Sequence, residues 1–274
     1  MNPGVIALLA ALGLGLAFAL FFAVARRIDN YGIVDIAWSY AFGGLALFYA
    51  ATGSGWVGRR WLLAAMVVIW SARLGTHLYR RVMGHHPVED GRYVALRRDW
   101  AKHFTVTMFG FFQAQALSVV VLAGPFLAAM QNRSEGLADL EIAGALTWLL
   151  GVSGEALADA QLNEFKRRGL GSGAVCTVGL WRFSRHPNYF FEWLVWVGYF
   201  VFAAAAPWGW TTAYAPLVML YLLFRVTGIP LTEEQAIRSK GDAYRRYQET
   251  TSVFVPWLPR ASNAAPPSTE SRGG

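Results

Sequence analysis

The chain has 274 residues, of which 55% are hydrophobic and only 15% are charged, and its mean hydropathy is +0.34. This composition places the chain in the membrane class and not among ordinary soluble domains. The net charge of +7 could suggest a nucleic-acid partner, but the distribution of the basic residues argues against one. Cys176 is the only cysteine, so a disulfide within the chain is impossible.

Seven apolar segments are long enough, or nearly so, to cross a bilayer core of about 30 Å. They cover residues 3–25, 32–52, 61–80, 104–130, 140–160, 188–206 and 209–228. The first is not expected to be a removable signal peptide, because its apolar run is too long and Arg26 and Arg27 follow it. We predict an all-α bundle of about seven transmembrane helices in a single domain, residues 1–259. A disordered tail rich in Pro, Ser, Ala and Gly is expected at residues 260–274.

The basic residues predict the orientation of this bundle. With the amino terminus outside, nearly all Lys and Arg residues fall on the cytoplasmic side, as the positive-inside rule requires. The exceptions are Arg59, Arg60 and Arg133 outside and Arg73 within a span. The carboxyl terminus is then cytoplasmic, and the longer connections face the same compartment. The basic surplus therefore reflects topology, and function is expected to face the cytoplasm.

Polar side chains inside the spans are the first candidates for a site, because each ionisable group costs roughly 2.5–3.5 kcal/mol to insert. All lie in the predicted cytoplasmic halves of their spans: Asp35, Arg73, His77, Glu155, Asp159, Asn163 and Glu192. Structural ion pairs could explain some of them, but as a set they indicate a buried polar ligand. Trp38, Tyr40, Trp70 and Tyr79 lie near Asp35 and Arg73 in sequence. They could wall the apolar part of a site, although aromatic residues in membrane helices usually serve packing.

The stretch from Gly179 to Glu192 joins a cationic loop to an apolar helix. It contains Arg182, Arg185, His186, Asn188, Tyr189 and Glu192. Pro187 suits the first turn of a helix, whose free amides, together with the arginines, would suit a phosphate-bearing ligand. A positive-inside flank before a helix is the plainer alternative. That alternative does not explain Asn188 and Glu192, one helical turn apart inside the span.

A nucleotide cofactor accounts for this combination of residues. Lys166, Arg167 and Arg168 add cations to the same rim, more than orientation alone requires, and the carboxylates and Asn188 suit ribose hydroxyls or an amide. The glycine-rich run at 169–173 follows a helix and lacks the dinucleotide-binding spacing, so we expect a flexible loop. No Cys/His cluster indicates zinc, and no metal is expected.

The region after Pro230 is predicted to form one more helix, ending near Thr250. Thr232 and Gln235 have the spacing of a capping box. An amphipathic helix at the membrane surface is an equally plain interpretation. Residues 253–257 are apolar, and we expect them to bring the chain back to the membrane surface.

With these residues in hand, the chain resembles the steroid 5α-reductase family, most closely its bacterial membrane branch. The resemblance covers most of the chain and is strongest over residues 155–192 and 232–257. It rests on the motif Gly-Leu-Trp-x-x-Ser-Arg-His-Pro-Asn-Tyr with Glu192 following, on Asp159 in the preceding helix, and on the later Tyr-x-x-Tyr. The Arg-His-Pro-x-Tyr core also resembles that of isoprenylcysteine carboxyl methyltransferases and sterol reductases.

The resemblance implies a seven-helix membrane fold, NADPH entering from the cytoplasm, and reduction of the C4–C5 double bond of a 3-oxo-Δ4 steroid or similar enone. It implies a substrate side mainly in residues 1–130 and an NADPH side mainly in 140–257. With the charge pattern, it gives these cofactor contacts: Glu155, Asp159, Asn163, Lys166, Arg182, Arg185, His186, Asn188, Tyr189, Glu192, Arg238, Tyr244 and Tyr247. It places Asp35 and Trp70 at family site positions, and these two with the intramembrane Arg73 are the catalytic candidates. Trp38 and Tyr40, from the aromatic residues near them, are the expected substrate contacts. A lipophilic substrate and membrane lipid are the expected partners, with no nucleic acid and no obligate protein partner, in a bacterial inner membrane.

The sequence departs from the family pattern on the substrate side. Val34-Asp35 replaces a Gln-Glu pair whose acid is hydrogen-bonded to the substrate carbonyl, Trp70 falls where the family has a tyrosine, and Thr251 roughly where it has an arginine. A protonated Asp35 would donate to the ketone oxygen as negative charge develops there. Arg73 nearby would oppose protonation. On this hypothesis Asp35→Asn, which retains a donor, keeps more activity than Asp35→Ala.

Two alternatives remain open from the sequence. Methyl transfer from S-adenosylmethionine to a lipid-like acceptor uses a similar scaffold, but that cofactor carries no phosphate for the Lys166-Arg167-Arg168 cluster. A binding or scaffold protein that inherited the fold is the other alternative.

Overall fold

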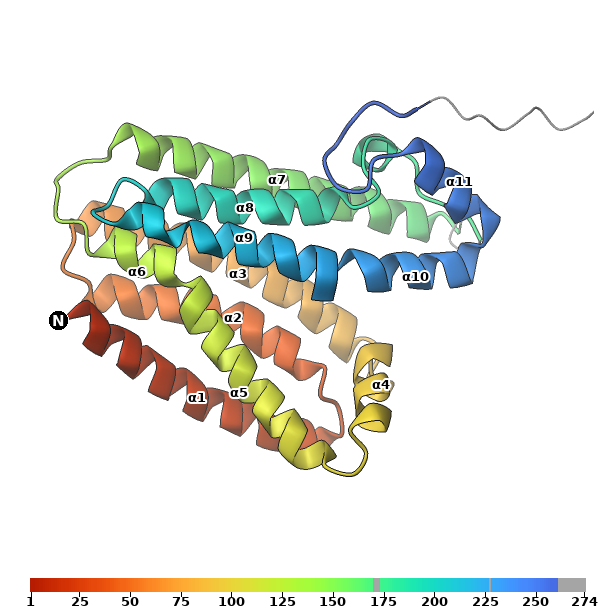
Figure 1. The fold of residues 1–274 in the computed structure, drawn as a ribbon, viewed down its shortest axis with the longest axis horizontal. Coiled ribbons are helices and arrows are strands. Elements are labelled where there is room, and N and C mark those ends of the chain that lie inside the picture. The colour runs from red at the N-terminus through yellow and green to blue at the C-terminus, as the bar shows by residue number, and fades with distance from the viewer. Residues whose placement is uncertain (170–172, 227, 261–274) are drawn as a thin grey trace, which may run out of the picture. The chain divides into compact units, whose positions relative to one another are not determined.

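The computed structural model describes residues 1–169, 173–226 and 228–260, and every regular element in them is a helix (Figure 1). The all-α prediction is therefore confirmed. The predicted loop at 169–173 is described only at its two ends, and of the predicted tail only Arg260 lies within the described residues.

The helices follow the predicted spans closely. They are α1 (Pro3–Ile28), α2 (Ile33–Thr52), α3 (Val57–Met83), α4 (Gly91–Asp99), α5 (Phe104–Leu122), α6 (Gly124–Met130), α7 (Asp139–Arg167), η1 (Gly179–Arg182), α8 (Pro187–Ala203), η2 (Gly209–Ala213), α9 (Tyr214–Tyr221), the π-helical η3 (Leu222–Val226), α10 (Ile229–Lys240) and α11 (Asp242–Thr250). Six stretches in the described part are long and apolar enough to cross a membrane: α1, α2, α3, α5 with α6, α7, and the stretch from η2 to α10. These lengths and compositions are those of an integral membrane protein with several spans.

The chain forms two compact units. Unit 1 consists of Met1–Trp148 and Trp196–Leu217, and unit 2 of Leu149–Val195 and Val218–Gly274.

An aromatic cluster forms the core of unit 1. Trp70, Phe42, Phe126 and Trp196 are fully buried and Tyr199 is 1% exposed, with ring centroids 4.8–6.4 Å apart. Most of these rings meet edge to face, the arrangement that the aromatic quadrupole favours. This placement gives Trp70 a packing role in the core.

The predicted span 104–130 is interrupted where α5 ends and α6 begins. Pro125 has no N–H, so it cannot donate to the Val121 carbonyl as a continuous helix would require. The Tyr214 hydroxyl, 2.6 Å from the Val121 oxygen, donates that hydrogen bond instead. A side chain at Gly124 would collide with the same hydroxyl. Tyr214 thus supplies the hydrogen bond that Pro125 cannot make to the Val121 carbonyl.

A buried ion pair fixes the connection before α7 in unit 1. Arg59 is 1% exposed and Glu141 is 0% exposed, and the two pair through both carboxylate oxygens. The Arg59 guanidinium also donates to the carbonyls of Asn132, Ser134 and Gly136 at 2.7–2.8 Å. All five of its N–H groups are therefore used.

In unit 2, α7 and α8 run antiparallel and in close contact. A Cβ on Gly151 would lie 2.8 Å from the Val195 side chain, and one on Gly154 would overlap the Phe191 ring. Only glycine allows the two helices to approach this closely. The contact sets the register that positions the candidate site.

The carboxyl-terminal helices differ from the prediction in two respects. α10 begins at Ile229, and the Thr232 hydroxyl donates to the Gly228 carbonyl at 2.9 Å, so the predicted capping box does not form. Thr232 is already inside the helix, where such a back-bond is usual. The single predicted helix is also broken into α10 and α11 at Gly241, whose φ of 54° is left-handed.

Candidate functional site

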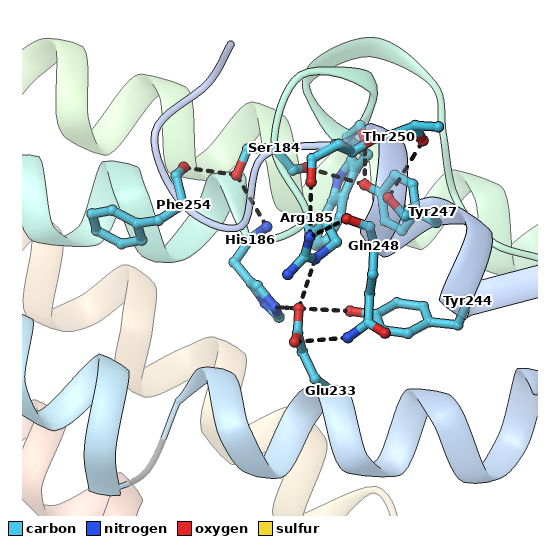
Figure 2. A network of polar contacts seen from close by, with 11 residues as sticks. Ser184, Arg185, His186, Glu233, Tyr244, Tyr247, Gln248, Thr250 and Phe254 are labelled. Atoms are coloured by element: carbon cyan, nitrogen blue, oxygen red, sulfur yellow. Dashed lines mark hydrogen bonds and ion pairs between the residues drawn. The ribbon is translucent and has the colours of Figure 1, made fainter. Parts of the chain in front are cut away.

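The Ser-Arg-His motif of unit 2 is the centre of a network of polar contacts (Figure 2). Arg185 Nε donates to Glu233 Oε1 at 2.7 Å, and Nη1 donates to the carbonyls of Gln248 and Thr251 at 3.0 and 2.8 Å. The Arg185 backbone N–H donates to the Ser252 carbonyl at 2.8 Å. One residue therefore ties the loop before α8 to α10 and to the end of α11.

Glu233 is the acceptor on which this network converges. Its carboxylate also accepts from Gln248 Nε2 at 2.9 Å and lies 3.2 Å from His186 Nε2 and 3.4 Å from the Tyr244 hydroxyl. The Arg185 and Glu233 side chains are 11% and 16% exposed. Charge-assisted bonds in such a poorly hydrated place are stronger than surface ion pairs.

Ser184 and Tyr247 complete the network. Ser184 Oγ donates to the Phe254 carbonyl at 2.7 Å and accepts from the His186 backbone N–H at 3.1 Å. The Tyr247 hydroxyl bonds the carbonyls of Trp181 and Ser184. Burial raises the pKa of Tyr247, so its phenol stays a donor at neutral pH.

Four predicted cofactor contacts are thus committed to the chain itself: Arg185, His186, Tyr244 and Tyr247. Burial and then the Glu233 carboxylate raise the pKa of Tyr244, which therefore also remains a donor. The structure gives these four side chains the role of holding residues 242–254 against the motif loop.

Asp159 and Asn188 meet on the α7–α8 pair. Asn188 Nδ2 lies 3.4 Å from Asp159 Oδ1. Since the helices are antiparallel and Gly151 faces Val195, the register places Glu155 and Glu192 at one level, a helical turn beyond Asp159 and Asn188. Both glutamates are buried, at 5% and 7% exposed. Three carboxyl groups and one amide therefore occupy two adjacent levels of the helix pair.

The remaining predicted cofactor residues lie toward the surface of unit 2. Asn163, Lys166 and Arg182 are exposed, and Arg238 is exposed and bonded to Glu234 at 2.6 Å. The Tyr189 ring stacks on His186 with centroids 5.4 Å apart, and its hydroxyl is 3.1 Å from Thr232 Oγ1. Tyr189 therefore supports the motif loop.

In unit 1, Asp35 is held by two residues of α4. Arg92 Nη2 donates to Asp35 Oδ2 and the Tyr93 hydroxyl donates to Oδ1, both at 2.8 Å. An aspartate with both oxygens accepting in this way cannot also donate to a ketone. The geometry therefore does not support the predicted donor role of Asp35, whose carboxylate pairs with the Arg92 guanidinium.

The predicted substrate contacts of unit 1 make internal bonds as well. Trp38 Nε1 donates to Ser118 Oγ at 2.9 Å, and its ring packs edge-on against Phe42. The Tyr40 hydroxyl lies 2.9 Å from Thr76 Oγ1, and Tyr40 is 43% exposed. The structure thus gives both residues packing contacts.

Comparison with known proteins identifies the family of this chain. The family model DUF1295, described as a protein of unknown function, matches residues 21–251. The chain belongs to this family. An uncharacterized protein of Schizosaccharomyces pombe (strain 972), C594.04c, is 29% identical to this DUF1295 protein over 289 residues, covering 94% of this chain and 80% of the relative. No solved structure matches the present chain. The family match includes every residue predicted for the site.

Sequence reasoning missed the α4 residues of this DUF1295 protein. Arg97 donates to Glu89 Oε2 at 3.0 Å and to Asp29 Oδ1 at 2.8 Å, and its guanidinium lies over the Tyr31 ring. With Arg92 and Tyr93 it ties α4 to the ends of α1 and α2. A signal was present: residues 89–99 contain three acids and three arginines, a density of opposite charges that is typical of ion-paired helices.

Lowering the pH below about 4 is expected to loosen α4. Burial raises the pKa of Asp90, but the Arg92 amide and the Arg92 and Arg81 charges outweigh burial and hold that pKa below its usual value. A carboxyl whose pKa is lower when folded contributes stability above its unfolded pKa, and this is lost as the pH falls through the folded pKa. Hydrogen exchange at α4 amides, corrected for intrinsic rates, should rise in that window. Asp90→Asn keeps an N-cap acceptor, so it should reduce the pH dependence, while the other carboxylates that bind α4 arginines remain. A pH dependence of undiminished size in the variant would contradict the assignment.

Proposed function

We propose that this protein is a membrane-embedded reductase that uses NADPH to saturate a carbon–carbon double bond conjugated to a ketone in a lipophilic substrate. The observation that carries the proposal is the α7–α8 register, which groups Asp159, Asn188, Glu155 and Glu192 on two adjacent levels of unit 2. Buried acids and an amide in apolar helices are costly unless they serve a ligand or one another.

The residues present fit such a cofactor. Carboxylates accept hydrogen bonds from ribose hydroxyls, and an asparagine both donates to and accepts from a carboxamide. Asp159 and Asn188 would hold these groups, and the exposed Lys166 and Arg182 supply cations for phosphates. NADPH supplies a hydride when bound. The Arg185–Glu233 network supports this site by fixing the loop that begins α8.

Asp35 enters this proposal as a positioning residue. Its carboxylate, held by the Tyr93 hydroxyl, orients the Arg92 guanidinium. Arg92 has further N–H groups beyond those bonded to Asp35 and Asp90, and such a donor is what a ketone oxygen needs as negative charge develops on it. A 3-oxo-Δ4 steroid is the substrate class to test first, on the family resemblance.

We further propose seven membrane crossings, with the amino terminus outside and the carboxyl terminus in the cytoplasm of a bacterial inner membrane. α8 would be the seventh crossing: its 17 residues span about 26 Å, and apolar residues continue to Ala206. The positive-inside pattern supports this orientation and places the mouth of the proposed site at the cytoplasm.

The decisive experiment is NADPH consumption by detergent-purified protein with and without progesterone or testosterone. We expect steroid-dependent oxidation and a product heavier by two hydrogens. NADPH binding without turnover would keep the reductase and exclude this substrate class. Neither binding nor turnover would reject the proposal, and transfer from labelled S-adenosylmethionine would establish the methyltransferase alternative.

Asn188→Ala should weaken NADPH binding by about tenfold, the loss expected when one ligand hydrogen bond disappears from a buried site. Equilibrium binding by nicotinamide fluorescence checks this. Asn132→Ala is a matched truncation in unit 1, where Asn132 is buried and caps a loop, so it should change stability and not affinity. Unchanged affinity in Asn188→Ala would remove Asn188 from the site.

A further inference from the structure

Unit 2 contains an open cavity of about 600 Å³ that is separate from the α7–α8 polar levels. Its lining comes from two segments far apart in the sequence, the loop and η1 at 175–182 and the region 243–259. Both segments lie outside the six stretches that could cross a membrane. The cavity therefore opens where a water-soluble group could enter.

Two arginines without partners give this cavity its charge. Within the described part of the chain, Arg182 and Arg246 line the cavity and their guanidinium groups make no hydrogen bond or ion pair. Four other exposed arginines of unit 2 are paired with acids: Arg167 and Arg168 with Glu164, Arg238 with Glu234 and Arg245 with Asp242. Arg225 and Arg260 are exposed as well and have no acid partner among the described residues, but neither lines the cavity. None of the described lining residues is acidic. Arg182 and Arg246 are therefore two unpaired guanidinium groups at one cavity, where they are available to a ligand.

The walls of the cavity are held in place before any ligand binds. The Tyr247 hydroxyl, on one wall, bonds the Trp181 and Ser184 carbonyls. The Arg260 backbone N–H donates to the Thr250 carbonyl at 2.8 Å, which closes the end near Pro259. Thr177 and Thr250 add hydroxyl groups to the lining. The Thr250 hydroxyl already donates within α11, so the guanidinium groups are the main free donors. A preformed cavity with free guanidinium donors matches the hydrogen-bonding needs of a phosphate.

We propose that this cavity binds a phosphate group through Arg182 and Arg246. Resting on the proposed function, the first source is the phosphate that distinguishes NADPH from NADH. The second source is the headgroup of an anionic phospholipid at the membrane surface. The apolar part of the lining, Val175, Ala243 and Pro259, would contact the less polar body that carries the phosphate.

The test compares the wild type, Arg182→Gln/Arg246→Gln and the control Arg245→Gln, all as full-length detergent-purified protein. Arg245 is adjacent to Arg246 on α11, is 65% exposed and pairs with Asp242, so its loss removes one positive charge from the same helix but outside the cavity. Arg182 and Arg246 are exposed, and we expect unchanged Tm in all three proteins. The readouts are the dissociation constants of NADPH and NADH and, by native mass spectrometry from nanodiscs, the retention of phosphatidylglycerol against phosphatidylcholine.

For the cofactor source, the double variant should raise the dissociation constant of NADPH at least about tenfold while that of NADH changes less than about twofold. For the lipid source, both dinucleotides should be unaffected and the double variant should lose phosphatidylglycerol. The control should behave as wild type in either case. Lipid retention that depends on the arginines in a protein that binds no dinucleotide would support the cavity and reject the proposed function. Wild-type affinity of the double variant for NADPH and for phosphatidylglycerol would overturn the phosphate site.

Discussion

Arg59→Met is expected to lower the free energy of unfolding by about 3–5 kcal/mol, the usual cost of stranding one member of a buried ion pair. Glu141 is 0% exposed and would keep only the Ala138 backbone N–H at 2.8 Å as a donor. The carbonyls of Asn132, Ser134 and Gly136 would lose their shared donor at the same time. In a chain of this size the loss corresponds to a fall in Tm of about 10 °C, measurable by thermal unfolding in detergent.

Two further variants separate the ion pair from its surroundings. Arg59→Met/Glu141→Leu removes both charges, so it should recover part of the loss. The Ser134 and Gly136 carbonyls still lose the Arg59 donor, whereas the Asn132 carbonyl keeps the Trp56 backbone N–H at 3.1 Å. Arg133→Met changes an exposed arginine in the same connection and should leave the Tm unchanged. If the double variant were no more stable than Arg59→Met, a stranded carboxylate would not be the cause.

The Arg59–Glu141 pair also shows where sequence reasoning stops. Arg59 counted as an exception to the positive-inside pattern, and Glu141 lay in the first turn of a predicted span. The two residues are 82 positions apart, but both were expected at the same side of the membrane. Arg59 broke the positive-inside rule, and Glu141 was a costly acid at the start of a span on the same side of the membrane. Together they were a usable signal for a buried ion pair.

Some other features could be predicted from the sequence, and the rest could not for physical reasons. The helical spans were predictable because apolar length and helical hydrogen bonding together determine them. Asp159 and Asn188 were expected in the same polar zone, from the helical stripe on α7 and the motif on α8, but the contact between them was not predicted. The partner of Asp35 was not, because Arg92 lies 57 residues away on a short polar helix that shows no membrane pattern. The role of Arg185 was also missed, since a phosphate and the Glu233 carboxylate attract the same guanidinium.

That ambiguity gives the second large prediction: Arg185→Met should release the carboxyl-terminal part of unit 2 without any cofactor present. The variant loses bonds to Glu233 and to the Gln248 and Thr251 carbonyls, and it leaves a carboxylate that is only 16% exposed without its guanidinium. A loss of about 3 kcal/mol would raise the population of the open form on the order of 100-fold. Hydrogen exchange should accelerate by that factor at α11 and at residues 251–254.

Cys176 provides an independent readout of the same opening. It is 3% exposed, and burial raises the pKa of its thiol, so the wild type should resist a maleimide at neutral pH. Arg185→Met should react rapidly, whereas Arg245→Met, which loses only an exposed ion pair on α11, should remain protected. Protection in Arg185→Met combined with weaker NADPH binding would reverse the assignment, because Arg185 would then be a cofactor contact and not the tie between the motif loop and the carboxyl-terminal helices.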